Sequence, residues 1–471
     1  MIFNSFLFLW LFPIIFCIYL FIRSNRLRRL YPRMGNAFLL LISYLLYIKW
    51  NPAYSLILFG VTFVTYYVAL KIEKDNVLSK KKYLICCGIT LATLPLLVFK
   101  YYNFLTQTAE VVLGWVGVEV GLPGLNWAMP LGISFYTFQA IGYLVDVYLC
   151  RIKAERNWWD YMLFVSFFPQ IASGPISKAA DLLPQIKANR QFNEQQFVQG
   201  CKWLLWGMFL KVVVADRIAL NVNDVYIHMQ TNGGFTLLMA SVMYSMQIYC
   251  DFAGYSFMAV GVGEILGFEL INNFSRPYFS QSVTEFWHRW HISLSIWLKD
   301  YVYIPLGGSR CSKVRNYWNI MITFLVSGLW HGANWTFVVW GGLHGLFQVI
   351  EKAIGLNKKI STGILKLTRI IVVFLFVTFT WIFFRMPTFG DAFYVICKIF
   401  TNHQGAFSQW TASILFALIV IFKDTTDEMN INKMRLFHSK YILVRWSTYM
   451  LLVFMIMAFG VYGGQFIYSG F

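Results

Sequence analysis

Charged residues are scarce in this chain of 471 residues. They make up 13% of the sequence, about half of the share in soluble domains, whereas 58% of the residues are hydrophobic. The eight cysteines are scattered and form no Cys-x-x-Cys pair, which excludes a sequence-readable disulfide framework or zinc site. No internal repeat, low-complexity tract or soluble domain is visible. A single membrane domain over residues 1–471 therefore accounts for the chain.

Apolar runs separated by short charged loops recur along the whole length. They predict an all-α, polytopic integral membrane protein with about ten or eleven transmembrane helices, plus re-entrant and interfacial helices. The apolar runs cover residues 2–22, 36–50, 53–70, 83–100, 131–149, 203–214, 235–249, 252–266, 319–330, 335–350, 370–384, 407–421 and 447–461.

The net charge of +18 does not indicate nucleic-acid binding, because the Lys and Arg residues lie mostly in loops between apolar runs. There they set orientation, and the cluster from Arg23 to Arg33 places the N-terminus outside the cytoplasm. A basic cytoplasmic face would also attract an anionic coenzyme or an acidic carrier protein.

Two features interrupt the apolar pattern. Gln139 and Asp146 lie within one run, and both are expected to face protein or a water-filled cavity rather than lipid. Residues 161–178 contain Pro169, Gly174 and Pro175 where a helix would cross, which predicts a re-entrant element.

Four of the seven histidines fall between residues 251 and 345. Glu285, His288 and His291 follow at i, i+3 spacing, which predicts one helix face on a helix that continues to Pro305. Glu-x-x-His is also a di-iron ligand unit, but such centres need it on two helices and this sequence offers it once. We therefore expect no metal site.

Further along, His331 lies between Gly328 and Gly332, which allow close helix packing or approach to a ligand. We expect structural roles for His288 and His344.

Together these motifs closely resemble the membrane-bound O-acyltransferase family. The resemblance is greatest to its bacterial branch, with the alginate O-acetylation, peptidoglycan O-acetylation and teichoic-acid D-alanylation membrane subunits. The matching motifs are Gln-Ile-Tyr-Cys-Asp-Phe-Ala-Gly-Tyr-Ser (247–256), Glu-Phe-Trp-His-Arg-Trp-His-Ile-Ser-Leu-Ser (285–295), Trp-Leu-Lys-Asp-Tyr-Val-Tyr-Ile-Pro-Leu-Gly-Gly (297–308), Gly-Leu-Trp-His-Gly (328–332) and Trp-Ile-Phe-Phe-Arg (381–385).

The resemblance implies a helical fold around a central funnel, with His331 near the membrane midplane and His291 close by. It also implies substrate or donor contacts, for which we name Asp251, Trp287, Trp330 and Asn334. One position departs from the family pattern: Phe257 stands where the family usually has Asp, which removes any role of that carboxylate.

By the same resemblance, the ending Phe-Ile-Tyr-Ser-Gly-Phe (466–471) matches related acyl-transfer systems, in which the tyrosine carries the acyl group transiently. Tyr468 is therefore a candidate relay, and the alternative is an aromatic residue anchored at the membrane interface.

The predicted function is O-acyl transfer, most readily O-acetyl transfer, in a bacterial plasma (inner) membrane. His331 would be the general base and His291 would orient it or stabilise charge. The donor would be acetyl-CoA or an acyl-carrier-protein thioester, used as a substrate rather than a tightly bound cofactor. The acyl group would pass to an extracytoplasmic partner protein that modifies a cell-surface polysaccharide.

Two alternatives stay open on the sequence. A secondary transporter or flippase is one, because Asp146, Lys211, Asp251 and Glu264 lie in or near apolar runs and such residues can line a substrate path. The other is direct acylation of a lipid without a partner protein.

Overall fold

The computed structural model describes residues 3–171, 174–356, 361–405, 407–429, 437, 439–464 and 466–467. Within these ranges every regular element is a helix and no β-strand occurs, as the composition predicts. The chain divides into two compact units, which consist of Met1–Gly200, Val262–Ile271 and Ser469–Phe471, and of Cys201–Gly261 and Asn272–Tyr468. Compactness does not decide whether the units fold separately, so the single domain stays a prediction.

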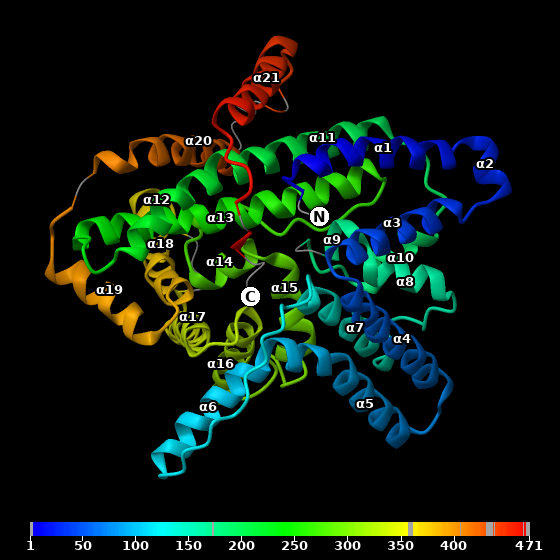
Figure 1. Ribbon diagram of the computed structural model, residues 1–471, viewed down its shortest axis with the longest axis horizontal. Helices are drawn as coiled ribbons and strands as arrows, with labels where there is room; N and C mark the ends of the chain where they lie inside the picture. Colours follow the sequence, from blue (N-terminus) through cyan, green and yellow to red (C-terminus); the bar gives the residue numbers. More distant parts are fainter. Residues whose placement is uncertain are drawn as a thin grey trace. The chain divides into compact units, whose positions relative to one another are not determined.

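The first unit is built around α7 (Ile133–Tyr148), whose residues are almost all buried and which packs against α4 and α5 (Figure 1). Nε2 of Gln139 donates to the Phe164 carbonyl at 2.7 Å, and Asp146 pairs with Arg151 at 3.1 Å. Both polar side chains therefore face protein, as predicted. The other helices are α1 (Phe6–Ile22), α2 (Asn25–Leu30), α3 (Met34–Trp50), α4 (Pro52–Lys74), α5 (Leu78–Leu96), the π-helix η1 (Leu97–Tyr101), α6 (Tyr102–Trp115), α8 (Trp158–Ser166), α9 (Phe168–Ile171) and α10 (Ala179–Lys187).

The predicted break in residues 161–178 is present. Helix α8 ends at Ser166, the four-residue helix α9 follows, and residues 174–178 are not helical. A Cβ at Gly174 would lie 2.6 Å from Cα of Gln170, so the chain folds back too tightly here for any side chain.

The second unit centres on two helices that pack along each other, α16 (Lys313–His331) and α17 (Trp335–Ala353). The remaining helices are α11 (Glu194–Met208, which begins in the first unit), the π-helix η2 (Phe209–Ala215), α12 (Asp216–Ile227), α13 (Gly234–Ile265, which ends in the first unit), the 3₁₀ turn η3 (Pro277–Phe279), α14 (Val283–Arg289), α15 (Ile292–Leu298), the π-helix η4 (Lys299–Tyr303), α18 (Gly363–Arg385), α19 (Phe389–Thr401), the 3₁₀ turn η6 (Ser408–Trp410), α20 (Thr411–Glu428) and α21 (Ile442–Phe459).

Length and composition suit four of the described helices for crossing a membrane: residues Pro52–Lys74, Leu78–Trp115, Gly363–Arg385 and Ile442–Phe459. The apolar helices Leu7–Ile22 and Met34–Trp50 are shorter. The count of ten or eleven crossings stays a prediction.

Two predicted boundaries are wrong. The runs 235–249 and 252–266 form one continuous helix, α13, because Asp251 between them is buried against a lysine instead of breaking the helix. The helix expected from Glu285 to Pro305 is broken at His291, whose backbone is left-handed at φ +45°. Glu285 and His288 therefore share α14, whereas His291 precedes α15.

Glycines set the distance between α16 and α17. A Cβ at Gly328 would lie 2.3 Å from the Phe337 carbonyl oxygen, and one at Gly341 would lie 2.3 Å from the Phe324 carbonyl oxygen. The close helix packing predicted for Gly328 is thus present.

We predict that Gly341→Ala lowers the free energy of unfolding by about 1–3 kcal/mol, because the new methyl group forces two helix backbones apart. Gly342→Ala is the matched control, since its Cβ would meet only Leu325 at 3.7 Å. Thermal unfolding in detergent compares the two variants. Equal stability of both would contradict the close contact.

Candidate active site

His331 is the last residue of α16, and its side chain is 1% exposed. Its Nδ1 lies 2.7 Å from the Ser327 carbonyl oxygen, one turn earlier. A carbonyl oxygen only accepts, so Nδ1 must carry the hydrogen. In the neutral imidazole the basic lone pair is then on Nε2, which is the protonation state that a general base requires.

His291 lies in the turn between α14 and α15. Its ring centroid is 6.4 Å from that of His331, with the ring planes at 84°. This separation is too large for a direct hydrogen bond between the rings. The Ser327 carbonyl, rather than His291, therefore orients His331, and of the two predicted roles of His291 charge stabilisation fits the geometry better.

The left-handed backbone of His291 is held from outside the turn. The backbone N–H of Ile292 donates to the Asn273 carbonyl at 3.0 Å, and that of Ser293 donates to Oδ1 of Asn273 at 3.0 Å. Such a conformation costs on the order of 1–3 kcal/mol for a non-glycine residue and persists where its surroundings fix it. Here it turns the imidazole into the interior, where it is 0% exposed.

Aromatic rings surround both histidines. Trp330 contacts both, with centroids 4.9 Å from His331 and 5.6 Å from His291. Trp340 and Phe384 lie 4.7 Å and 5.7 Å from His331. These rings exclude water and lower the local dielectric, so dipoles and charges act more strongly on a reacting group there.

A cavity of about 500 Å³ lies beside this centre, between α14, α15, α16 and α17. Its lining includes Trp287, His288, Ser327 and two basic side chains, Lys299 and Lys352. Ser327 is also the residue whose carbonyl oxygen accepts from Nδ1 of His331, so the cavity borders the residue that orients the proposed base. Its basic residues suit an anionic ligand.

Carboxylates fix both ends of α14. Oε1 of Glu351 accepts from the backbone N–H of Val283 at 2.6 Å, which caps the helix start. At the other end Arg289 donates twice to Glu428, at 2.9 and 3.1 Å. Sequence reasoning missed both carboxylates, because partners 68 and 139 positions apart leave no local signal.

Two of the predicted donor-binding residues have structural contacts. Oδ1 of Asn334 accepts from the N–H of Thr336 and its Nδ2 donates to the Pro387 carbonyl, so Asn334 caps α17. Asp251 lies 2.5 Å from Nζ of Lys211, and its other oxygen accepts from the backbone N–H of Ile467 at 2.7 Å. Of the four residues, only Trp287 lines the cavity.

His344 is fully buried in a hydrogen-bonded chain. Nε1 of Trp287 donates to its Nδ1 at 3.2 Å, so its Nε2 carries the hydrogen and donates to Thr380 at 3.0 Å. These contacts fit the predicted structural role. His288, by contrast, lines the cavity, and its structural role stays a prediction.

Tyr468 lies outside the described residues. Across the part of the chain that the structure does describe, no cluster of three or more His, Cys, Asp or Glu side chains is placed to hold a metal ion.

Comparison with known proteins identifies this architecture. The model of the MBOAT family, membrane-bound O-acyltransferases, matches residues 153–390, which include both His291 and His331. This chain belongs to the membrane-bound O-acyltransferase family. It is an O-acyltransferase, as predicted.

Its similarity to individual members covers most of the chain. It is 36% identical over 417 residues to the probable alginate O-acetylase AlgI of Pseudomonas aeruginosa, which covers 88% of this chain and 77% of that protein. It is 34% identical over 425 residues to the peptidoglycan O-acetyltransferase of Helicobacter pylori, at 84% and 79% coverage. A teichoic acid D-alanyltransferase of Streptococcus thermophilus is 31% identical over 270 residues, or 54% of this chain and 64% of the relative.

The ion cluster around Lys211 gives a test of what holds the second unit together. Lys211 is 0% exposed and bridges Asp216 at 2.7 Å and Asp251 at 2.5 Å. Lys211→Met would leave two buried carboxylates without their cation, and we predict a loss of about 3–5 kcal/mol in unfolding free energy.

The matched control is Lys423→Met, which removes a pair with Asp427, four residues along α20, whose side chains are 23% and 28% exposed. We predict a loss below about 1 kcal/mol for it. Thermal unfolding of both variants in detergent measures the two losses. A similar loss of unfolding free energy in both would mean that the Lys211 cluster does not stabilise the second unit.

Proposed function

We propose that this enzyme is an O-acetyltransferase of the bacterial plasma membrane that passes acetyl groups from a cytoplasmic thioester to a partner outside the cytoplasm. The observation that carries the proposal is the His331 geometry: a buried imidazole whose Nδ1 donates to the Ser327 carbonyl. Family membership supplies the reaction class, and the names of two relatives, an alginate O-acetylase and a peptidoglycan O-acetyltransferase, support acetyl as the group transferred.

The chemistry follows from that geometry. Nε2 of His331 removes the proton from the attacking hydroxyl, whose oxygen bonds to the thioester carbonyl carbon. The tetrahedral intermediate then collapses, the C–S bond breaks, and His331 returns the proton to the leaving thiolate. His291, 6.4 Å from His331 between ring centroids, stabilises the charge that develops on the carbonyl oxygen.

The donor enters the cavity beside α14. Lys299 and Lys352 on its wall suit the phosphates of acetyl-CoA or of an acyl-carrier prosthetic group, and Trp287 supplies an apolar surface for the pantetheine arm. The donor is a substrate and not a resident cofactor. Its arrival from the cytoplasm agrees with the basic loops that the sequence places on that side.

Contacts near the C-terminus support the relay role of Tyr468. The N–H of the preceding residue, Ile467, is held by Asp251, and the ring of Phe466 lies 6.0 Å from Phe252. Phe252 in turn lies 4.7 Å from His291. The chain just before Tyr468 thus approaches the surroundings of the histidine pair, where a phenol, more acidic than an alkyl alcohol, is an easily activated acceptor.

An extracytoplasmic protein would then take the acetyl group from Tyr468 and transfer it to a cell-surface polysaccharide. This step is supported by the names of the relatives, two of which denote enzymes acting on alginate and peptidoglycan. Multi-pass insertion with the N-terminus outside is part of the same proposal.

We predict that His331→Ala lowers acetyl transfer by about 10²- to 10⁴-fold while the protein still inserts, because the general base is lost. His228→Ala is the control, since that histidine is exposed and its imidazole pairs with Asp224, four residues earlier. Polysaccharide acetylation and membrane protein level are measured together. Near wild-type acetylation in His331→Ala would remove His331 from the mechanism.

We predict that Tyr468→Phe abolishes transfer to the external partner. The substitution removes only the hydroxyl group, whose oxygen is the proposed acceptor of the acetyl group. Tyr462→Phe, which deletes a hydroxyl that donates to the Ile456 carbonyl, is the matched control. Mass spectrometry of the C-terminal peptide checks for acetyl-tyrosine. Full acetylation by Tyr468→Phe, or transfer to lipid without any partner, would favour direct acylation.

A further inference from the structure

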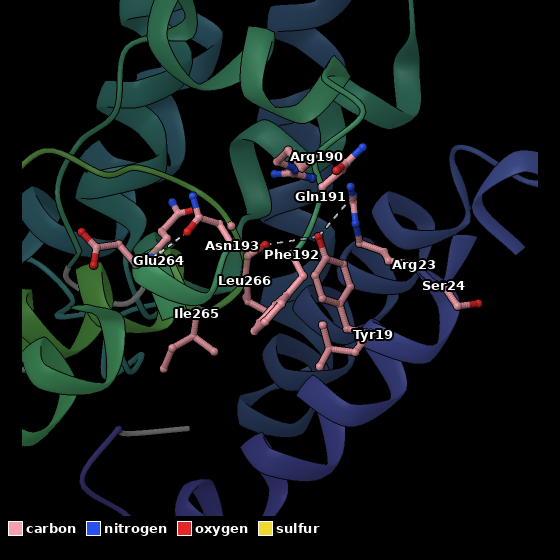
Figure 2. Close-up of a pocket in the computed structure, with 13 residues that line it drawn as sticks. Tyr19, Arg23, Ser24, Arg190, Gln191, Phe192, Asn193, Glu264, Ile265 and Leu266 are labelled. Carbon is pink, nitrogen blue, oxygen red and sulfur yellow. Dashed lines mark hydrogen bonds between the residues drawn. The ribbon is translucent and has the colours of Figure 1, made fainter. Parts of the chain in front are cut away.

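A second cavity lies within the first unit. Its volume is about 460 Å³, and its walls come from the C-terminal end of α1, residues 190–196, the end of α13 and the turn that follows it (Figure 2). None of its lining residues belongs to the histidine centre or to the cavity beside α14.

Specific contacts hold the walls of this cavity in place. The hydroxyl of Tyr19 donates to the Leu266 carbonyl at 3.3 Å, and Arg190 donates to Oδ1 of Asn36 at 3.1 Å. The guanidinium of Arg190 also lies 3.3 Å from the ring centroid of Phe268. The cavity is therefore a built feature of the unit and not a gap between loose segments.

Two side chains of opposite charge, Arg23 and Glu264, line this cavity, and no ion pair joins them. Nη1 of Arg23 lies 3.4 Å from the Tyr19 hydroxyl, but its Nη2 has no hydrogen-bond partner among the described residues. Oε2 of Glu264 likewise has none there. Figure 2 shows Glu264 and Arg23 on opposite sides of the cavity, with Arg190 near Arg23. Shielded polar atoms without partners are costly, so a ligand that pairs with both is favoured.

The surface next to the cavity is apolar. Along α1 the side chains of Trp10, Ile14, Ile18 and Phe21 are 66%, 55%, 43% and 70% exposed. Their spacing of three or four residues places them on one helix face. Leu20 lies between that face and Arg23 around the helix and lines the cavity, together with Phe192, which is 58% exposed. In a membrane protein such apolar surface contacts acyl chains, so a lipid that lies along this side of α1 brings its headgroup to the cavity.

From this arrangement we infer that the cavity binds a phospholipid whose headgroup joins a phosphate to a primary ammonium group, as in phosphatidylethanolamine. Arg23 and Arg190 bind the phosphate, Glu264 accepts hydrogen bonds from the ammonium, and the acyl chains lie along α1. Small rotations of the Arg23 and Glu264 side chains bring their unpartnered atoms to the ligand. This site goes beyond the proposed acyl transfer and does not depend on it.

Native mass spectrometry of the full-length protein in detergent tests the inference, with dioleoyl-phosphatidylethanolamine, -phosphatidylglycerol and -phosphatidylcholine as probes. We predict that the wild type binds the ethanolamine lipid about tenfold more tightly than the other two, which lack a primary ammonium group. Arg23→Gln should weaken binding of both phosphatidylethanolamine and phosphatidylglycerol by about tenfold, because a charge-assisted contact to the phosphate is lost.

Glu264→Gln should remove the preference for the ethanolamine lipid and leave phosphatidylglycerol binding within about twofold. The matched controls are Arg29→Gln and Glu269→Gln, because neither residue lines the cavity. Both should bind as the wild type does. Soluble phosphoethanolamine should compete only weakly, since it lacks the chains that lie on α1.

Three outcomes would overturn the inference. They are equal wild-type binding of all three lipids, an unchanged ethanolamine preference in Glu264→Gln, and soluble phosphoethanolamine binding as tightly as the lipid. If Arg23→Gln does not fold, Arg23→Lys replaces it. It keeps the charge but loses the fork geometry, and should weaken phosphate binding less than removal of the charge would.

Discussion

The close approach of α16 and α17 is the constraint on which the candidate site depends. Because Gly328 and Gly341 have no side chains, the two helix backbones can approach each other closely. Trp340 of α17 therefore lies against His331 of α16, at 4.7 Å between ring centroids. The same packing places His344 on Trp287 and so ties α14 to the pair. A wider spacing would open the histidine to water and release α14, which lines the cavity beside it.

The buried charged residues near the site pair with groups on other helices. Lys211, in the π-helical segment η2, meets Asp251 of α13 and Asp216 of α12. Glu428 meets Arg289, and Glu351 meets the first N–H groups of α14. Such contacts contribute little net stability against apolar packing, but they fix which helix faces meet. The site depends on these polar contacts, because aromatic side chains alone could pack between the helices in several ways.

The sequence predicts the helical class, most helix positions and the histidines that come together, because hydropathy and motif spacing are local signals. It fails where tertiary contacts overrule local pattern. The i, i+3 spacing of Glu285, His288 and His291 suggests one helix, but Asn273 holds the backbone of residues 292 and 293 and forces a left-handed turn at His291. Apolar pattern alone does not predict helix α19, because it follows α18 after only three residues, 386–388, of which Thr388 caps its start. Asp251 and Asn334, which the family resemblance suggests as ligand contacts, bind other protein groups in the structure, and their role toward a ligand stays a prediction.

The departure at Phe257 is resolved by geometry. Phe257 is buried and stacks on Trp203 at 4.9 Å, so this position contributes packing rather than charge. Asp251 does not replace a carboxylate there, because six residues along a helix rotate the side chain by about 240°, onto another face. Asp251 instead joins the Lys211 cluster to the N–H of Ile467. Asp251 therefore ties the backbone at Ile467, close to the end of the chain, to a buried ion cluster on α13 and η2.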